Sequence, residues 1–186
     1  IDCAIWDIIA KRANASLYQI INGKHSVVKI YASGINPTGS LETVGRCRDL
    51  GYTAFKLKIG FGDDTDLRNL AAIAKSLSDN EQMMTDANQG WSVEKTIEIL
   101  PKLAAFPLQW LEEPIIATSP ASAWQKIQLA SPIPLAAGEN IMGTENFNNA
   151  ISHGQLDIIQ PDICKWGGIS GNLPVATLAH LCEAGL

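Results

Sequence analysis

The sequence predicts an α/β fold, a (β/α)-barrel of the TIM type that is truncated after about six βα units. Three observations predict it. Short β-like segments alternate with longer amphipathic segments along most of the chain. Each strand–helix unit takes between 20 and 30 residues, roughly what a βα unit needs. Finally, a charged side chain follows each of five consecutive β-like segments, and barrel enzymes carry their active sites at that end of the strands.

The first segment, residues 2–21, has the pattern of a helix. Ile5, Trp6 and Ile9 lie on one stripe, with charged residues on the opposite side. Asn22 and Gly23 then end it. We expect residues 1–25 to be a helical segment that stands apart from a partial barrel domain at residues 26–186.

The following segments alternate in a regular order. The expected strands are 27–33, 54–59, 82–87, 108–112, 135–138 and 157–161. The expected helices are 40–50, 64–77, 93–105, 119–129, 144–153 and 173–183. Ser40 and Ser92 are placed to cap the N-termini of their helices, Pro120 suits a first helical turn, and Gly51 suits a C-terminal cap.

The main alternative is an open, doubly wound sheet. That fold usually carries a glycine-rich phosphate-binding turn after its first strand. Residues 32–37, Ala-Ser-Gly-Ile-Asn-Pro, lack this pattern, which favours the barrel. A complete barrel takes about 250 residues, so the 186 residues here predict a piece of a longer protein.

Composition excludes several other classes of function. Hydrophobic residues make up 46% and charged residues 18%, which is typical of a folded globular protein. The net charge of −5 and the scattered acidic residues argue against a nucleic-acid partner, and no apolar run is long enough for a membrane span. Four cysteines without a CxxC pair predict buried, reduced thiols and a cytoplasmic location.

The strand ends carry the residues that we expect to do the chemistry. They are Lys58, Asp86, Glu112, Glu139 and Asp162, spaced 28, 26, 27 and 23 residues apart. With one residue for each βα unit, all five side chains are expected to converge on one rim. The carboxylates of Asp86, Glu112 and Glu139 offer the hard oxygen donors that Mg²⁺ prefers, whereas zinc would favour Cys and His.

Lys56 and Lys58 form a second unusual feature. Residues two apart on a strand point to the same face, so both ammonium groups are expected at the barrel mouth. Crowding by another cation and by a metal would lower the pKa of a lysine toward that of a usable general base. Alternatively, one lysine of the pair, Lys56, holds a carboxylate while Lys58 acts.

These segments resemble the enolase superfamily, in its mandelate racemase and muconate lactonising enzyme branch. The motifs that carry the resemblance are Ala54-Phe55-Lys56-Leu57-Lys58, Thr85-Asp86-Ala87-Asn88, Trp110-Leu111-Glu112-Glu113-Pro114, Ala137-Gly138-Glu139-Asn140 and Gln160-Pro161-Asp162. The resemblance covers nearly the whole chain in the right order. It implies a modified barrel, Mg²⁺ on Asp86, Glu112 and Glu139, and Lys58 as the acid/base catalyst. It also implies that residues 1–25 are a connecting helix from an N-terminal capping domain outside this sequence.

Other positions are assigned less directly. Asn88, Asn140 and Lys165 are candidates for contacts with substrate, and Glu113 is expected to point away from the metal and to be structural. Asp162 stands where muconate-lactonising relatives carry a lysine. In the mandelate racemase-like subgroup this implies an Asp that pairs with a His on the seventh strand, which lies beyond this sequence.

The expected activity is the Mg²⁺-dependent removal of a proton alpha to a carboxylate, through an enediolate intermediate. The favoured reaction is dehydration of an acid sugar by a lyase. An isomerase, that is, a racemase or epimerase of a 2-hydroxy acid, is the close alternative, and a non-catalytic metal-binding barrel is the distant one. We expect a homo-oligomer that acts on a small-molecule carboxylate.

Overall fold

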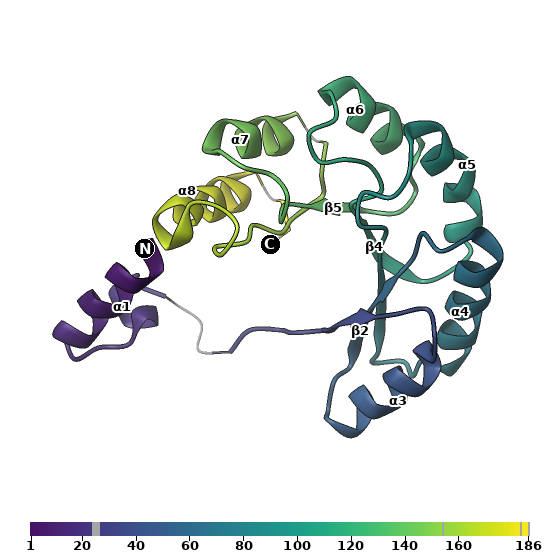
Figure 1. Cartoon of the computed structure of the whole chain (residues 1–186), viewed down its shortest axis with the longest axis horizontal. Coiled ribbons are helices and arrows are strands. Elements are labelled where there is room, and N and C mark those ends of the chain that lie inside the picture. The colour runs from purple at the N-terminus through teal and green to yellow at the C-terminus, as the bar shows by residue number, and fades with distance from the viewer. Residues whose placement is uncertain (24–26, 154, 183, 186) are drawn as a thin grey trace.

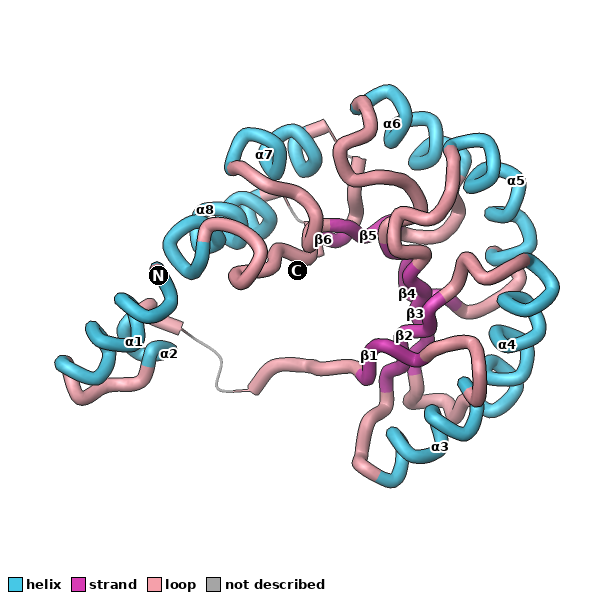
Figure 2. The backbone as a smooth tube through the Cα atoms, in the orientation of Figure 1, coloured by secondary structure: helices cyan, strands magenta, loops and turns pink. Residues whose placement is uncertain are grey.

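The computed structural model describes residues 1–23, 27–153, 155–182 and 184–185. Its strands form one parallel sheet whose spatial order is the sequence order, β1 to β6. The strands are β1 (Ala32–Ile35), β2 (Ala54–Lys58), β3 (Gln82–Asp86), β4 (Leu108–Glu112), β5 (Leu135–Ala137) and β6 (Ile158–Ile159). They line the inside of an arc (Figure 2). A doubly wound sheet would reverse its order at a switch point, so the predicted barrel class is confirmed.

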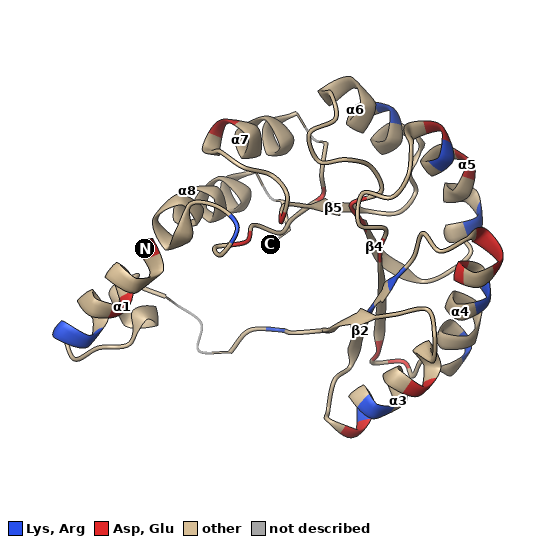
Figure 3. Ribbon diagram, viewed as in Figure 1, with Lys and Arg blue, Asp and Glu red and all other residues tan. Residues whose placement is uncertain are grey.

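Helices cover the outer side of the arc (Figure 1). They are α3 (Ser40–Asp49), α4 (Asp63–Ser76), α5 (Val93–Leu103), α6 (Ala121–Ala130), α7 (Thr144–Ser152) and α8 (Gly168–Leu181). Acidic and basic segments intermingle on the outer faces of α3, α4 and α5 (Figure 3). The described residues include no helix that is long and apolar enough to cross a membrane.

The core lies between the strands and this outer layer. On β2, Phe55 and Leu57 are buried in the hydrophobic cluster, together with Leu70 and Ile73 of α4. Because side chains alternate along a strand, Lys56 and Lys58 point to the other face, toward the inside of the arc. Apolar burial on one face of β2 therefore fixes that its two lysines face inward.

The N-terminal segment is two helices rather than one. α1 (Asp2–Arg12) and α2 (Leu17–Ile20) are separated by a turn in which Asn14 has a φ of 50°. Ser16 then opens α2 with a reciprocal capping box to Gln19. The prediction of one helix over residues 2–21 is wrong because this local capping competes with a continuous helix.

Helix and strand starts also differ in places. The expected strand at 27–33 begins only at Ala32, and α8 begins at Gly168 rather than at residue 173. Gly39, with a φ of 68°, stands at the N-cap of α3, so Ser40 is the first helical residue. The Ser92 cap is confirmed by a hydrogen bond from Lys95 N to Ser92 Oγ of 3.1 Å. Pro120 is itself an N-cap, that of α6.

The first helix is attached to the last one (Figure 1). Trp6 Nε1 donates to Ser170 Oγ at 2.9 Å, and Ser170 N donates to Asp2 Oδ2 at 3.0 Å. The Asp2 carboxylate therefore satisfies a backbone donor in the first turn of α8. The expected boundary between a connecting helix and the barrel, at residues 25 and 26, lies outside the described residues and stays a prediction.

All four cysteines are free. Cys3 and Cys47 are half-buried, whereas Cys164 and Cys182 are exposed, so the expectation of four buried thiols is wrong. Cys164 lies in the loop after β6 and Cys182 at the end of α8, and both positions face away from the core.

Candidate active site

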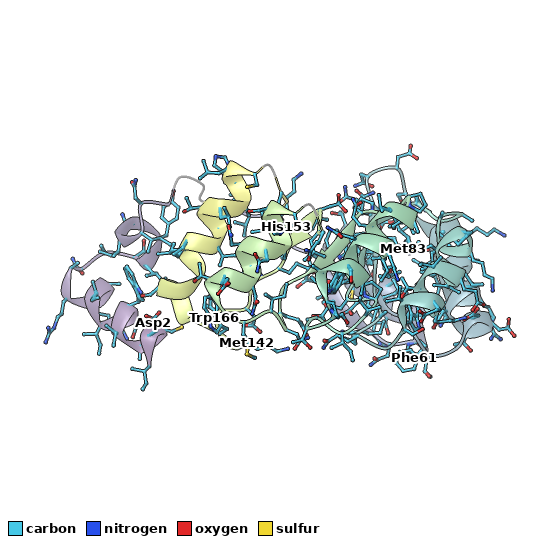
Figure 4. All side chains as sticks on the ribbon, turned by 90° about the horizontal axis from the view of Figure 1, so that it is seen from above. Asp2, Phe61, Met83, Met142, His153 and Trp166 are labelled. Atoms are coloured by element: carbon cyan, nitrogen blue, oxygen red, sulfur yellow. The ribbon has the colours of Figure 1, made fainter. Side chains whose placement is uncertain are left out.

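The strand register brings the expected chemistry to one rim. Lys58 is paired in register with Asp86, and Asp86 with Glu112. Seen from above, Phe61, Met142 and Trp166 lie along one edge of the molecule, whereas His153 lies toward the opposite edge (Figure 4). Phe61, Met142 and Trp166 belong to the loops that follow β2, β5 and β6. The ends of adjacent parallel strands therefore form the rim that the spacing predicts.

Lys56 is the more deeply buried of the two lysines. Its Nζ is 2.6 Å from both carboxylate oxygens of Glu112 and 3.7 Å from Asp86 Oδ2. The Lys56 side chain is only 6% exposed. Burial works to lower the pKa of Lys56, but the hydrogen bonds and charge of Glu112 outweigh it, and the pKa is raised. Lys56 thus holds a carboxylate, which is the alternative considered for this pair of lysines.

Lys58 lies nearer the mouth of the site. Its Nζ is 2.6 Å from Asp86 Oδ2, and its side chain is 23% exposed, so the ammonium group is accessible from outside. Asp86 Oδ1 also accepts from Asn88 N at 2.8 Å, and Asn88 Nδ2 lies 3.3 Å from Asp86 Oδ2. Asn88 thus holds the carboxylate, with a φ of 45° that the tight turn after β3 imposes.

Glu112 is held from several sides. Besides Lys56, it accepts a hydrogen bond from Trp110 Nε1 to its Oε2 at 3.3 Å. Burial is the largest influence and raises the pKa of Glu112, while Lys56 acts in the opposite direction. The ion pair is therefore a buried one in which each partner compensates the desolvation of the other.

Two aromatic residues and one amide complete this part of the site. Tyr31 packs edge-on against Trp110 with ring centroids 5.4 Å apart, and Lys56 Nζ lies 5.2 Å from the Tyr31 ring. Gln160 Nε2 donates to Tyr31 Oη at 3.2 Å. Sequence reasoning missed these residues. Trp110 could have been found, because it lies two positions before Glu112 and so shares its face of the strand.

Glu139 stands apart from the other two carboxylates. It follows β5 by two residues and its side chain is 37% exposed. Lys165 Nζ, from the loop after β6, binds Glu139 Oε1 at 3.0 Å, and this hydrogen bond is the main cause of the raised pKa of Lys165. Asn140 Nδ2 approaches the same Glu139 oxygen at 3.3 Å.

Asn140 also contacts Glu113. Its Nδ2 lies 2.9 Å from both Glu113 oxygens, and its Oδ1 accepts from Lys165 Nζ at 3.1 Å. Glu113 is fully buried, and burial raises its pKa. All three candidate substrate contacts are thus engaged with carboxylates of the site: Asn140 and Lys165 here, and Asn88 with Asp86.

Asp162 lies in the loop after β6. Its Oδ1 accepts a hydrogen bond from Cys164 N at 2.7 Å and so fixes the start of the turn that leads to α8. No further side chain among the described residues is hydrogen-bonded to Asp162. Of the three predicted catalytic residues, it is the one that the structure does not bring into contact with the strand-end ion pairs.

The three expected metal ligands fit Mg²⁺ by their chemistry. Asp86, Glu112 and Glu139 are all carboxylates at the ends of adjacent strands, and Mg²⁺ prefers such oxygen donors. As the side chains lie, no group of three His, Cys, Asp or Glu residues in the described part of the chain is close enough to hold a metal ion. Each carboxylate is instead paired with a lysine.

A cavity of about 410 Å³ lies beside this rim rather than over the lysines. The loops after β4 and β5, with helices α6 and α7, form its walls. Asn140 lines the cavity and also contacts Glu139, so it separates the cavity from the strand-end carboxylates. Neither Lys56 nor Lys58 lines it.

The chain has well-defined relatives. D-galactarolactone cycloisomerase of Agrobacterium fabrum is 35% identical over 97% of this chain and 50% of its own length. L-talarate/galactarate dehydratase of Salmonella typhimurium is 32% identical over 96% of this chain and 46% of its own length. The chain thus spans about half the length of the curated relatives it matches.

Solved structures show the same likeness. A mandelate racemase/muconate lactonizing enzyme from Bordetella bronchiseptica superposes with a TM-score of 0.95 at 40% identity, over 98% of this chain and 50% of that one. A racemase from Streptomyces coelicolor with bound magnesium superposes with a TM-score of 0.92 at 31% identity, over 98% of this chain and 52% of that one. The family model described as "Enolase C-terminal domain-like" matches residues 41–185. Together with the parallel six-stranded arc and its strand-end carboxylates, this match shows that the chain belongs to the enolase C-terminal domain-like family.

Proposed function

We propose that the intact protein is a Mg²⁺-dependent lyase that dehydrates an acid sugar, beginning with removal of the proton alpha to the substrate carboxylate. One observation carries the proposal: two lysines and two carboxylates from adjacent strands are interleaved on one rim. Lys56 and Lys58 contact Asp86 and Glu112 there at 2.6 to 3.7 Å. The Salmonella relative named for talarate and galactarate supports the substrate class.

The two lysines take different roles in this proposal. Lys58 is the acid/base group, because its ammonium is the more accessible of the two and lies at the end of β2. Its neutral amine would take the proton from the carbon next to the carboxylate. Lys56 is buried against Glu112 with a raised pKa, so it stays protonated and holds the carboxylate in place.

Asp86, Glu112 and Glu139 would hold Mg²⁺, as the magnesium-bound racemase relative suggests. When bound, the cation would stabilise negative charge on the substrate oxygens as the proton leaves. Lys165, which contacts Glu139 Oε1 at 3.0 Å, would compete with the ion for this carboxylate. Asn88 and Asn140 would keep the carboxylates oriented, and Asp162 would support a proton-transfer group on the opposite side of the substrate.

A racemase or epimerase of a 2-hydroxy acid is the second candidate. The racemase relative favours it, and so does the position of Asp162 in the loop after β6, across the arc from Lys58 on β2. Two groups on opposite sides of a carbon acid suit proton removal from one face and return to the other. Which reaction occurs depends on whether the 3-hydroxyl leaves.

The test uses the intact protein with Mg²⁺ and a panel of aldonic and aldaric acids. A 2-keto product supports the lyase, whereas exchange of the alpha proton in D₂O without a keto product supports the racemase. Glu112→Gln and Asp86→Asn are expected to lower turnover at least about 100-fold. If both variants keep turnover within tenfold of the native protein, these carboxylates do not hold a catalytic metal ion and the proposal is wrong. If the native protein converts none of the acids, the barrel is a non-catalytic binder.

We also propose that the protein acts as a homo-oligomer in the cytoplasm. All four of its cysteines are free, which is typical of proteins in a reducing compartment. The substrates named for the relatives are small carbohydrate-derived acids or lactones. Light scattering on the intact protein would test the oligomer, and a monomeric mass would contradict it.

A further inference from the structure

The pair Glu113–Asn140 connects the inside of the fold to the exposed carboxylate Glu139. Glu113 is the residue after Glu112 and is 0% exposed, which is unusual for an acidic side chain that forms no ion pair with the described residues. Its hydrogen-bond partner is the Asn140 amide, 2.9 Å from both carboxylate oxygens. Burying a carboxylate that is held by a single neutral amide costs stability. This cost indicates that the contact has a role.

The backbone of Glu113 is held as firmly as its side chain. Glu113 N donates to Ala136 O at 2.9 Å, and its own carbonyl accepts from Gln89 N at 2.7 Å. Its φ is 43°, in the left-handed region that non-glycine residues seldom adopt. Hydrogen bonds from the neighbouring chain segments thus hold a conformation that turns the Glu113 side chain toward the loop after β5.

Asn140 has the amide orientation that its neighbours dictate. Its Nδ2 faces Glu113 and Glu139, and its Oδ1 faces Lys165 Nζ at 3.1 Å. Exchanging the two ends of the amide would place its NH₂ against an ammonium and its oxygen against two carboxylates. The negative charge of Glu113 therefore fixes which end of Asn140 points to Glu139.

Glu139 needs such a support more than the other two carboxylates do. Asp86 and Glu112 are the last residues of their strands and are nearly fully buried, so ladder hydrogen bonds and packing hold them. Glu139 lies beyond the end of β5 with a 37% exposed side chain. Its contacts among the described residues are Lys165 at 3.0 Å and Asn140 at 3.3 Å.

We propose that Glu113 is a positioning residue that acts through Asn140 to hold the Glu139 carboxylate where a divalent cation is bound. The inference rests on the proposed function, because it assumes that Glu139 is one of the ligands of Mg²⁺. Lys165 and the cation compete for Glu139, whereas Asn140 remains beside the carboxylate in either case. Glu113 thereby influences metal affinity without touching the metal.

The experiment measures the Mg²⁺ dissociation constant of the intact protein by titration calorimetry, without substrate. Glu113→Gln, which is nearly isosteric, is expected to weaken binding about tenfold, in line with the usual effect of losing an outer-shell partner. Asn140→Ala is expected to do the same. The double variant is expected to be within about twofold of the single variants, because both substitutions break one connection.

Glu145→Gln is the matched control. It removes the same charge from an exposed position in the first turn of α7, and Mg²⁺ affinity is expected to stay within about twofold. If Glu113→Gln behaves like this control, or if the two single effects multiply in the double variant, the inference is wrong. A purely structural role would lower the metal-free melting temperature and leave the dissociation constant unchanged, which also contradicts it.

Two further outcomes keep the tests separate. If Glu113→Gln does not fold, Glu113→Asp keeps the charge but is too short to reach Asn140, and it is expected to weaken Mg²⁺ binding to the same extent. If the native protein binds no Mg²⁺, or if Glu112→Gln leaves the affinity unchanged, the proposed function itself fails. If the native protein binds Mg²⁺ and Glu112→Gln weakens that binding, but Glu113→Gln leaves the affinity unchanged, only the positioning role is wrong.

Discussion

Lys56 of β2 and Glu112 of β4 form a buried ion pair across the strand that lies between them. The ammonium nitrogen is 2.6 Å from both carboxylate oxygens, and the two side chains are 6% and 3% exposed. The intervening strand contributes Asp86, 3.7 Å from the same nitrogen. One lysine therefore neutralises carboxylates from two neighbouring strands.

Breaking this pair from one side is expected to destabilise the fold. Lys56→Met leaves Glu112 as a buried charge without its cation, and we expect a loss of about 3–5 kcal/mol in the free energy of unfolding. Adding Glu112→Leu is expected to recover most of that loss, because both buried charges are then gone. Urea denaturation measures both values. A Lys56→Met variant as stable as the native protein would mean that the pair does not matter to folding.

Lys58→Ala is expected to affect chemistry and not metal binding. Removing the proposed proton-transfer group is expected to lower turnover of the intact protein by at least about 100-fold. Mg²⁺ affinity is expected to change by no more than about threefold, since Asp86 keeps its contacts with Asn88. Steady-state kinetics checks the expected loss of turnover, and titration calorimetry on the same samples checks the Mg²⁺ affinity. Near-normal turnover in Lys58→Ala, with turnover lost in a folded Lys56 variant, would reverse the assignment within the pair.

Arg48 and Glu81 predict an acid-sensitive contribution to stability. Arg48 Nε and Nη2 donate to the two Glu81 oxygens at 2.7 and 2.9 Å, and these hydrogen bonds lower the pKa of Glu81 from its ordinary value of 4.5. A carboxyl group with a lowered folded-state pKa adds stability that is fully present above its ordinary value, and this is lost as the pH falls through the folded value.

Glu81→Gln is therefore expected to cost about 1 kcal/mol at neutral pH and progressively less in acid. The measurement is the free energy of unfolding of both proteins at about pH 7 and about pH 3, on either side of the ordinary value. The Glu81 side chain is 7% exposed and that of Arg48 28%, so added salt is expected to reduce the difference only in part. An equal difference at both pH values would show that ionisation of Glu81 is irrelevant.

Two glycines offer a matched pair of substitutions. A Cβ at Gly138 would lie 2.6 Å from Gln160 N, a backbone atom of the loop after β6 that has little room to move. Gly138→Ala is therefore expected to destabilise the protein by about 2 kcal/mol or more. At Gly45, in the middle of α3, an added Cβ would meet nothing within 4 Å, and Gly45→Ala is expected to stabilise by about 0.5–1 kcal/mol. Thermal unfolding of both variants checks the opposite signs.

The regular part of this fold is readable from the sequence. Apolar alternation fixes the faces of β2, and the spacing of Lys58, Asp86 and Glu112 fixes their meeting point in register. The pattern predicts too long a first helix, because the competition between the Ser16 capping box and a continuous helix depends on a few hydrogen bonds. The stretch before Ala32 has β-like residues, but its described part pairs with no neighbouring strand.

Within the site, sequence spacing identifies which strands contribute but not which side chains pair. Lys56 of β2 lies closer to Glu112 of β4 than to Asp86 of the adjacent strand β3. Lys165, from the loop after β6, binds Glu139, which follows β5. Such pairings depend on side-chain reach and on burial, neither of which follows from a repeat of one βα unit. The full burial of Glu113 is equally hard to predict, because its position after a strand end resembles an exposed one in sequence.

The contact between α1 and α8 can form only late in synthesis of the chain. Asp2 and Ser170 are 168 positions apart, and ribosomes add roughly 5–20 residues each second. At that rate the first helix is made on the order of ten seconds or more before its partner exists. During that interval Asp2 and Trp6, which are hydrogen-bonded to Ser170 in the folded chain, have no α8 beside them. A nascent chain arrested before Ser170 is the form in which this helix is most available to chaperones.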